Sequence, residues 1–204
     1  MNNNTLFITA TNTNVGKTYA SEKFLRYYAK KGFKVGYFKP IETGVVDKPF
    51  DGSAMLKLTQ ELNPDFNVKI NDVVPYQFKL PAAPFVAKGS TKIDIDFLKQ
   101  KKEYLFNFCD FLIIEGAGGL LVPLEKDYFI IDLIQTFRSP VALIVPSRLG
   151  SINDTLLSKE ALKSRNIPFN WYINLFEDKE NFKEVTLPFY QATEEKINYL
   201  DELD

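Results

Sequence analysis

The sequence predicts a three-layer α/β fold, with a mostly parallel central sheet and helices on both of its faces. Short apolar runs of strand length alternate along the chain with segments whose apolar residues have helical spacing. Two of these runs, residues 111–114 and 140–145, are apolar at almost every position, as strands covered on both faces are. Glycine-rich or polar residues follow several runs directly. Such a pattern predicts a site at the carboxyl ends of parallel strands.

A phosphate-binding loop is predicted between the first strand and the first helix. The apolar run 6–8 precedes Gly16-Lys17-Thr18, and an amphipathic run follows them. In such a loop, backbone N–H groups and the positive helix end face an anion, Lys17 adds a charge and Thr18 offers a hydroxyl to Mg²⁺. Thr11 stands where the usual pattern has its first glycine, so the loop is atypical. The tripeptide alone is more typical of an ordinary helix start, but its flanks favour a P-loop NTPase-like fold.

The remaining elements follow from spacing and from turn residues. Residues 34–38 predict a second strand, which Pro40 ends because proline cannot continue the ladder. Residues 41–44 are expected to form a loop, and residues 51–62 a helix with Asp51 near its start. The elements expected after these, in chain order, are an edge strand at 71–78, a turn at 81–84, a helix at 94–108, strands at 111–114 and 140–145, a helix at 152–163 and a strand at 170–175.

Length and composition indicate one globular domain, residues 1–204. Apolar residues make up 45% of the chain and charged residues 25%, which is ordinary for such a domain. The net charge is −1 and no basic block stands out, so small molecules are expected as partners rather than nucleic acid or a membrane. The amino terminus lacks the features of a secretory leader and no apolar run is long enough to span a membrane, which indicates a cytoplasmic protein. Cys109, the single cysteine, is expected to pack as a small apolar residue.

The chain contains no histidine. This excludes Ser-His-Asp and Cys-His catalysis and most zinc sites, so acid–base chemistry must come from Asp, Glu, Lys, Tyr or water. Phosphoryl transfer fits this restriction, because it depends on positioning and on charge neutralisation more than on a general base.

Three charged residues at predicted strand ends could carry chemistry. Glu115 follows four apolar residues, where a second Mg²⁺ ligand would stand opposite Thr18; the alternative is a capping or solvated carboxylate. Lys39 could place a second ammonium near the phosphates, although a lysine after a strand is usually solvated. Asp51 could be a metal ligand, but its spacing is more typical of a helix N-cap. The glycines of 116–119 would let a ligand approach the backbone closely, or form a plain turn.

Taken together, these motifs resemble the dethiobiotin synthetase family. Residues 10–18 match the family loop G-T-D-T-x-V-G-K-T, with the leading glycine and the aspartate replaced. Residues 39–44 resemble its Lys-Pro motif, residues 115–119 are its Glu-Gly-Ala-Gly-Gly, and residues 149–153 are its Leu-Gly-x-Ile-Asn. Asn174 matches an asparagine that ends a later strand. The resemblance spans about residues 5–175.

The resemblance implies an ATP- and Mg²⁺-dependent ligase of biotin biosynthesis that closes a ring on 7,8-diaminononanoate with CO₂. It implies a cytoplasmic homodimer whose active sites are shared between two chains. The catalytic residues that it implies are Lys39, Lys17 and Thr13. The ATP-binding residues are Asn14, Val15, Gly16, Lys17, Thr18, Tyr19, Glu115, Gly118 and Asn174. The substrate-binding residues are Thr43, Gly118, Leu149, Gly150, Ser151, Ile152 and Asn153, and the metal ligands are Thr18, Asp51 and Glu115.

Two departures from the family pattern leave alternatives open. The metal aspartate usually stands in a Ser-Asp-Ala context, so Asp51 here is either shifted by two places or replaced by Ser53. Residues 187–190 are all that corresponds to the proline-rich loop of the family's purine pocket, so the sequence does not fix which nucleotide base the protein prefers.

The rival interpretation is a dimeric ATPase of the partitioning or cluster-carrier type. Such proteins carry a lysine at the position of Asn12, and this chain lacks it. A GTPase would need Asn-Lys-x-Asp on a late strand, whereas residues 174–177 here are Asn-Leu-Phe-Glu.

Overall fold

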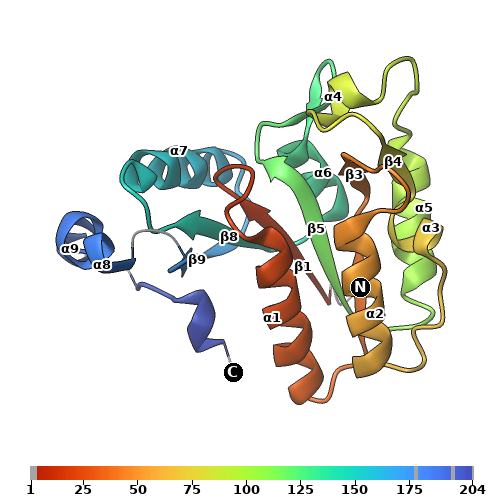
Figure 1. Cartoon of the computed structure of the whole chain (residues 1–204), viewed down its shortest axis with the longest axis horizontal. Helices are drawn as coiled ribbons and strands as arrows, with labels where there is room; N and C mark the ends of the chain where they lie inside the picture. Colours follow the sequence, from red (N-terminus) through yellow and green to blue (C-terminus); the bar gives the residue numbers. More distant parts are fainter. Residues whose placement is uncertain (1–3, 177–178, 194–195, 204) are drawn as a thin grey trace.

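A five-stranded parallel sheet forms the centre of the molecule. The computed structural model describes residues 4–176, 179–193 and 196–203. The strand order is β2-β5-β1-β8-β9, so β1, which leads into the phosphate loop, occupies the middle of the sheet (Figure 1). The five strands are β1 (Thr5–Ala10), β2 (Val35–Phe38), β5 (Phe111–Gly119), β8 (Val141–Pro146) and β9 (Phe169–Asn174). Their pairs are all parallel, which confirms the predicted sheet.

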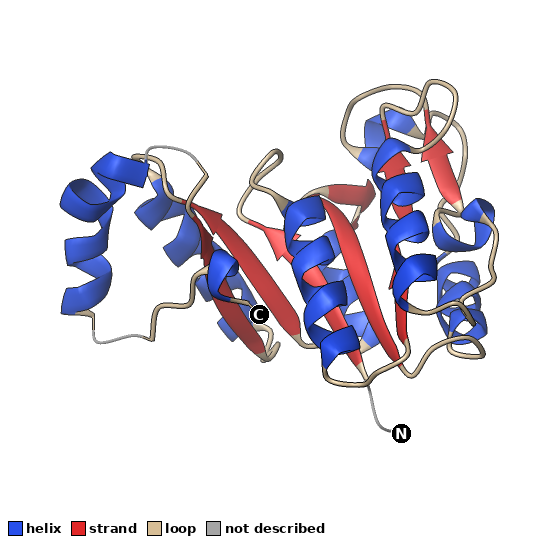
Figure 2. Ribbon diagram, turned by 60° about the horizontal axis from the view of Figure 1, so that its bottom comes forward, coloured by secondary structure: helices blue, strands red, loops and turns tan. Residues whose placement is uncertain are grey.

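Helices cover both faces of the sheet (Figure 2). The longer ones are α1 (Lys17–Lys30), α2 (Phe50–Leu62), α5 (Ile95–Leu105), α6 (Ile130–Phe137) and α7 (Ser151–Ser164). Shorter helical segments are α3 (Ile70–Val73), α4 (Pro84–Ala87), α8 (Lys179–Asn181), η1 (Phe182–Thr186), α9 (Leu187–Ala192) and η2 (Leu200–Glu202). Helix α1 packs on β1, β2 and β5, and α7 packs on β8. None of the helices described is long and apolar enough to cross a membrane.

The core lies on both sides of β5 and β1. Leu112, Ile113 and Ile114 follow one another along β5, so they point to alternate faces, and all three are completely buried. Burying side chains of this kind stabilises the fold by about 1.5–3 kcal/mol each. The apolar run that predicted a strand covered on both faces therefore also fixes where the helices pack. It ends at Glu115, a completely buried carboxylate side chain, at the point where the site begins.

The expectation of a loop at residues 41–44 is wrong. Strand β3 (Ile41–Thr43) pairs in parallel with β4 (Tyr76–Phe78) in a separate two-stranded sheet. The expected edge strand at 71–78 is also wrong in its first half, which is the short helix α3. At Pro40 the chain leaves the main sheet, and its carbonyl accepts a hydrogen bond from the Tyr76 N–H (3.3 Å). The small sheet lies near the carboxyl end of β5 (Figure 1).

The segment after β5 contains elements that the sequence analysis left unassigned. Strand β5 continues through the glycines to Gly119, and the antiparallel hairpin β6 (Pro123–Glu125) and β7 (Tyr128–Phe129) follows. Helix α6 then returns the chain to β8, and most of its residues are buried. Its apolar residues, at positions 130, 131, 133, 134 and 137, have helical spacing, so this helix left a signal in the sequence that the expected elements did not include.

Candidate active site

The phosphate loop connects β1 to α1 and depends on two residues with left-handed backbone conformations. Asn14 has φ 58° and Gly16 has φ 98°. A Cβ on Gly16 would lie 2.3 Å from Nδ2 of Asn174, so only glycine fits there. The same Nδ2 donates a hydrogen bond to the Val15 carbonyl (3.0 Å). Asn174 therefore supports the loop from the end of β9, in addition to lining the pocket described below.

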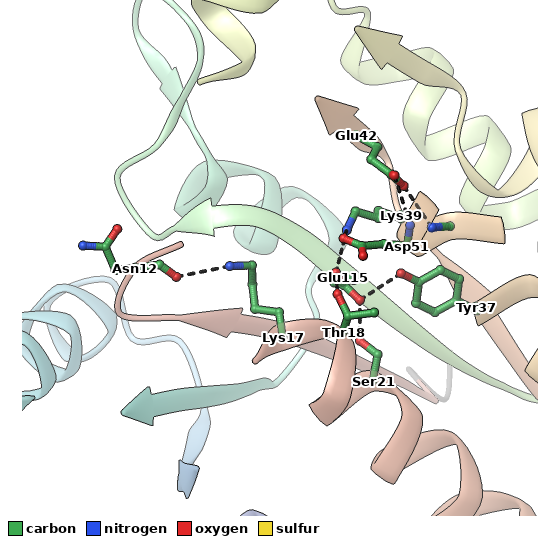
Figure 3. A network of polar contacts seen from close by, with 10 residues as sticks. Asn12, Lys17, Thr18, Ser21, Tyr37, Lys39, Glu42, Asp51 and Glu115 are labelled. Atoms are coloured by element: carbon green, nitrogen blue, oxygen red, sulfur yellow. Dashed lines mark hydrogen bonds and ion pairs between the residues drawn. The ribbon is translucent and has the colours of Figure 1, made fainter. Parts of the chain in front are cut away.

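Lys17 begins α1 and bends back over the loop. Its Nζ donates to the carbonyl of Asn12 (3.1 Å), which closes the loop upon itself (Figure 3). Burial lowers the pKa of Lys17, while the charge of Glu115 opposes that shift. Lys17 lines the pocket together with the loop residues Asn14 and Gly16. This is the arrangement that a polyphosphate requires.

Glu115 is the centre of the polar network in Figure 3. Its Oε1 accepts hydrogen bonds from the Thr18 hydroxyl (3.1 Å) and from Nζ of Lys39 (2.6 Å). Its Oε2 accepts from the hydroxyls of Ser21 (2.7 Å) and Tyr37 (2.8 Å). Burying a carboxylate is costly unless donors or cations satisfy it, and here four donors do so. The capping or solvated alternative for Glu115 does not fit this environment.

Lys39 joins the two carboxylates of the site. Its Nζ lies 2.7 Å from Oδ2 of Asp51 and 2.6 Å from Oε1 of Glu115, and its side chain is 6% exposed. Burial by itself lowers the pKa of Lys39, but the charges of Glu115 and Asp51 outweigh this effect and raise the pKa above its usual value. Lys39 is therefore a buried, charged ammonium and not a solvated lysine.

Asp51 is in the first turn of α2, but it does not cap that helix. The N-cap residue is Pro49, and the Asp51 carboxylate points toward Lys39 instead. The interpretation of Asp51 as an N-cap is therefore wrong. Asp51 lines the pocket, whereas Ser53 is not among the lining residues.

The oxygens of Thr18, Asp51 and Glu115 suit a hard cation such as Mg²⁺, which prefers carboxylates and hydroxyls together with substrate phosphates. Within the described part of the chain, no group of three or more Asp, Glu, Cys or His side chains could hold a metal ion by itself. A site made of only two carboxylates and a hydroxyl leaves positions for phosphate oxygens and water.

These residues face one pocket with a volume of about 990 Å³. Of the residues that the sequence analysis singled out, the pocket is lined by Thr13, Asn14, Gly16, Lys17, Thr18, Tyr19, Lys39, Thr43, Asp51, Glu115, Gly118 and Asn174. Val15 is buried beneath the loop and does not line it. The predicted residues thus come from the loop after β1, from the ends of β2, β5 and β9, from β3 of the small sheet and from helices α1 and α2. A site at the carboxyl edge of the central sheet is what this fold predicts.

Residues 149–153 lie outside this pocket. They form the turn from β8 into α7, where Gly150 has φ 89° and Leu149 is 74% exposed. Ser151 is buried, and the turn is closed by an ion pair between Arg148 and Asp154 (2.9 Å). Leu149, Gly150, Ser151, Ile152 and Asn153 therefore do not contact the pocket of their own chain.

The far end of the pocket is formed by the carboxyl end of β9 and by the C-terminal segment. Leu175, Phe176 and Asp201 line it, and Asp201 accepts a hydrogen bond from the Tyr19 hydroxyl (2.8 Å). Residues 187–190, matched above to the family's purine loop, instead begin helix α9. Tyr190 packs against Trp171 with the ring centroids 4.9 Å apart, so this stretch does not reach the pocket.

The sequence analysis missed several residues of the site, and some of them left a signal. Ser21 stands three residues after Thr18, which places both on one face of a helix. Tyr37 stands two residues before Lys39, which places both on one face of a strand. Glu42 and Asp201 left no such signal, because neither 41–44 nor the C-terminal segment was expected to form regular structure.

Comparisons with known proteins show the family to which the chain belongs. A family model described as an AAA domain matches residues 4–175. A curated protein of Sulfurovum sp., named ATP-dependent dethiobiotin synthetase BioD, is 55% identical, covering 92% of this chain and 90% of that protein. Proteins of the same name from Wolinella succinogenes and Helicobacter pylori (strain Shi470) are 39% and 34% identical. The first match covers 96% of this chain and 92% of the relative, and the second 95% and 91%.

Solved structures show the same fold at much lower identity. A plasmid partition protein from Borrelia burgdorferi gives a TM-score of 0.58 at 16% identity, covering 96% of this chain and 87% of that one. The MinC:MinD cell division complex from Aquifex aeolicus gives 0.56 at 19%, covering 95% and 78%. At such identities the likeness concerns the fold alone.

Proposed function

Because the chain belongs to the ATP-dependent dethiobiotin synthetase family, we propose that it joins 7,8-diaminononanoate and CO₂ into dethiobiotin, with release of ADP and phosphate. It is an ATP-dependent ligase of biotin biosynthesis. The observation that carries the proposal is the position of Lys39. Its ammonium is buried between Asp51 and Glu115, in the same pocket as the phosphate loop.

The reaction has three steps, and none needs a covalent enzyme intermediate. One amine of the substrate adds to CO₂ and loses a proton, which gives a carbamate. A carbamate oxygen then attacks the γ-phosphorus of ATP, the bond to the bridging oxygen breaks and ADP leaves. Finally the second amine attacks the carbamoyl carbon, closes the ring and expels phosphate. Because the carbamate is a weak nucleophile, the site must hold it in line and absorb charge.

The residues divide these tasks. Lys17 and the loop N–H groups would bind the ATP phosphates, and Thr13 would line the same pocket near the substrate amines and the carbamate. Lys39 would face the carbamate and the transferred phosphoryl group, and Thr43 the substrate amines. Thr18, Asp51 and Glu115 would hold Mg²⁺, which supplies positive charge to the phosphates when it is bound.

The proposal includes a homodimer with shared sites. Residues 149–153 would bind the substrate's carboxylate at the N-terminal end of α7 on behalf of the partner chain, since they lie outside their own pocket. Leu149 and Leu157 are 74% and 64% exposed on this turn and helix. An interface there would cover both leucines. We further propose that residues 1–204 act as one domain in the cytoplasm, where ATP is available.

The distant structural neighbours do not favour a nucleotide-switched partitioning ATPase. They share only the fold, whereas the relatives at 34–55% identity are named as synthetases. The fold alone supports both activities, so the assignment depends on the site.

Stimulated phosphate release tests the proposal. With ATP and Mg²⁺ present, bicarbonate and 7,8-diaminononanoate together should raise ATP hydrolysis, and each alone should not raise it to that level. A matched acid with a single amino group is the control, because it can form a carbamate but cannot close the ring. Mass spectrometry should find dethiobiotin only with the diamine. Hydrolysis that is indifferent to both compounds would contradict the proposal.

A further inference from the structure

Helix α2 begins without a cap of its own. Its N-cap residue is Pro49, and no side chain at that position accepts from the first turn. The first N–H groups of a helix have no partners within it and need acceptors from elsewhere. Here Oε1 of Glu42 accepts from the Asp51 N–H (3.1 Å) and Oε2 accepts from the Gly52 N–H (2.9 Å). Glu42 lies on β3, so one element caps another.

Glu42 is well suited to this role because it is itself held in place. It is 6% exposed, and β3 aligns it with Gln77 of β4. A buried carboxylate needs donors, and the two N–H groups at the positive end of α2 supply them. Figure 3 shows its carboxylate directed at the start of α2, next to Lys39 and Asp51.

Gly52 gives an independent indication that this contact is close. A Cβ at Gly52 would lie 3.1 Å from Oε2 of Glu42 and 2.2 Å from Cγ2 of Val74. Glycine is otherwise a poor residue inside a helix. Its presence in the first turn of α2 is explained by the approach of Glu42 and Val74 to the backbone.

The residue that is capped is also the residue that reaches the site. The backbone N–H of Asp51 binds Glu42, while its Oδ2 lies 2.7 Å from Nζ of Lys39. Any change in the first turn of α2 must therefore move this carboxylate. We propose that Glu42 is a positioning residue, which sets Asp51 beside Glu115 and Thr18 for metal binding. The inference rests on the proposed function, because it assumes that Asp51 is a metal ligand.

Helix α5 provides a matched control. Its N-cap Asp94 accepts from the N–H groups of Asp96 (2.9 Å) and Phe97 (3.1 Å), so it also holds a first turn by two hydrogen bonds. No residue of α5 lines the pocket. Loss of this cap should lower stability without affecting the metal site.

The experiment compares Glu42→Gln, Gly52→Ala, Asp94→Ala and Asp51→Asn with the wild type. Three quantities are measured: the Tm, the Mg²⁺ concentration that gives half-maximal activity, and the increase in ATP affinity that Mg²⁺ causes, by calorimetry. Glu42→Gln leaves one N–H facing an amide nitrogen. It should raise the Mg²⁺ requirement about tenfold, as loss of a group that orients a ligand typically does. Its Tm should fall by about 2–4 °C.

Asp94→Ala, which removes both hydrogen bonds of the α5 cap, should lower the Tm by a similar amount and leave the Mg²⁺ requirement unchanged. Gly52→Ala should raise that requirement, and it replaces Glu42→Gln if that protein does not fold. A folded variant of Glu42 or Gly52 with a wild-type Mg²⁺ requirement, beside an impaired Asp51→Asn, would overturn the positioning role alone. If Asp51→Asn instead has the same Mg²⁺ requirement as the wild type, Asp51 is not a metal ligand. The positioning role of Glu42 would then be wrong as well.

Discussion

Glu115 shows how one side chain can hold the site together. Its two oxygens have different neighbours: Oε1 is bound by Thr18 and Lys39, which line the pocket, and Oε2 by Ser21 and Tyr37, which do not. The buried hydroxyls therefore fix the orientation of the carboxylate, and its other oxygen faces the pocket. The strand run that ends at Glu115 indicated this residue, but its four partners come from α1, from β2 and from the residue that follows β2.

The Tyr37 hydroxyl can be removed without a change in packing. Burial, and after it the charge of Glu115, raises the pKa of Tyr37 well above 10, so the hydroxyl stays a donor. Tyr37→Phe should cost about 1.5–3 kcal/mol of unfolding free energy, since hydrogen bonds to charged groups have this magnitude. Urea unfolding measures the loss. Tyr104→Phe, at an exposed position of α5, is the control and should change stability little.

Lys17→Ala should abolish most turnover and leave the fold intact. The lost charge acts mainly while the γ-phosphoryl group is transferred, so kcat should fall roughly 100-fold or more. Circular dichroism and a turnover assay test both parts, with Lys30→Ala in the last turn of the same helix as a control. Near-normal turnover in a folded Lys17→Ala protein would remove the loop from the mechanism.

Lys39→Met should weaken ring formation more than ATP binding. Methionine keeps much of the side-chain volume but leaves Asp51 and Glu115 without their shared cation. Two unpaired carboxylates repel each other, so the variant should also depend more on Mg²⁺ for its thermal stability than the wild type does. Nucleotide titration compared with turnover separates the two effects. A variant that loses only ATP affinity contradicts the assignment.

At the scale of elements, spacing predicted those that are apolar and regular. The run at 111–114 falls within β5, the run at 140–145 overlaps β8 from Val141 onward, and Gly16-Lys17-Thr18 marks the start of α1. The spacing of apolar residues did not predict elements whose structure depends on partners distant in the sequence. Strand β3 exists because β4, more than thirty residues later, pairs with it, and nothing local in 41–44 indicates that pairing. The cap that Glu42 provides for α2 could not be predicted for the same reason.

The contact between β9 and α1 should weaken at alkaline pH. Tyr172 of β9 meets Phe24 of α1 edge to face at 5.2 Å, and burial raises the pKa of Tyr172 to about 12. The unfolded chain loses this proton near pH 10, so stability falls as the pH rises from about 10 through 12, and is unaffected below that range. Tyr172→Phe should lose less stability between pH 9 and 11 than the wild type in urea unfolding. Equal losses would contradict the assignment.

At the scale of the whole molecule, the fold brings the predicted site residues into one pocket, apart from Val15, which is buried, and one group of five residues. The group left outside is 149–153, which begins α7. Within one chain, this turn would be no more than a helix start. Under the proposed function it completes the site of a second chain, and in a two-fold dimer that arrangement is reciprocal.

Mixing two inactive proteins tests this arrangement. Lys17→Ala disables the phosphate loop, and Asn153→Asp puts a negative charge where the substrate's carboxylate should bind. Asn153 is exposed in the first turn of α7, so aspartate fits there without strain, whereas any side chain at Gly150 would have to adopt φ 89°. Each protein alone should be nearly inactive, because both of its sites carry one lesion.

A mixed dimer would hold one site with both lesions and one with neither. Random reassociation makes about half of the dimers mixed, so about a quarter of wild-type activity should return if the two sites act independently. Subunit exchange is verified separately with two different affinity tags on the variants. Exchange without any recovered activity would show that each chain builds its site alone, and residues 149–153 would then be a helix start and nothing more.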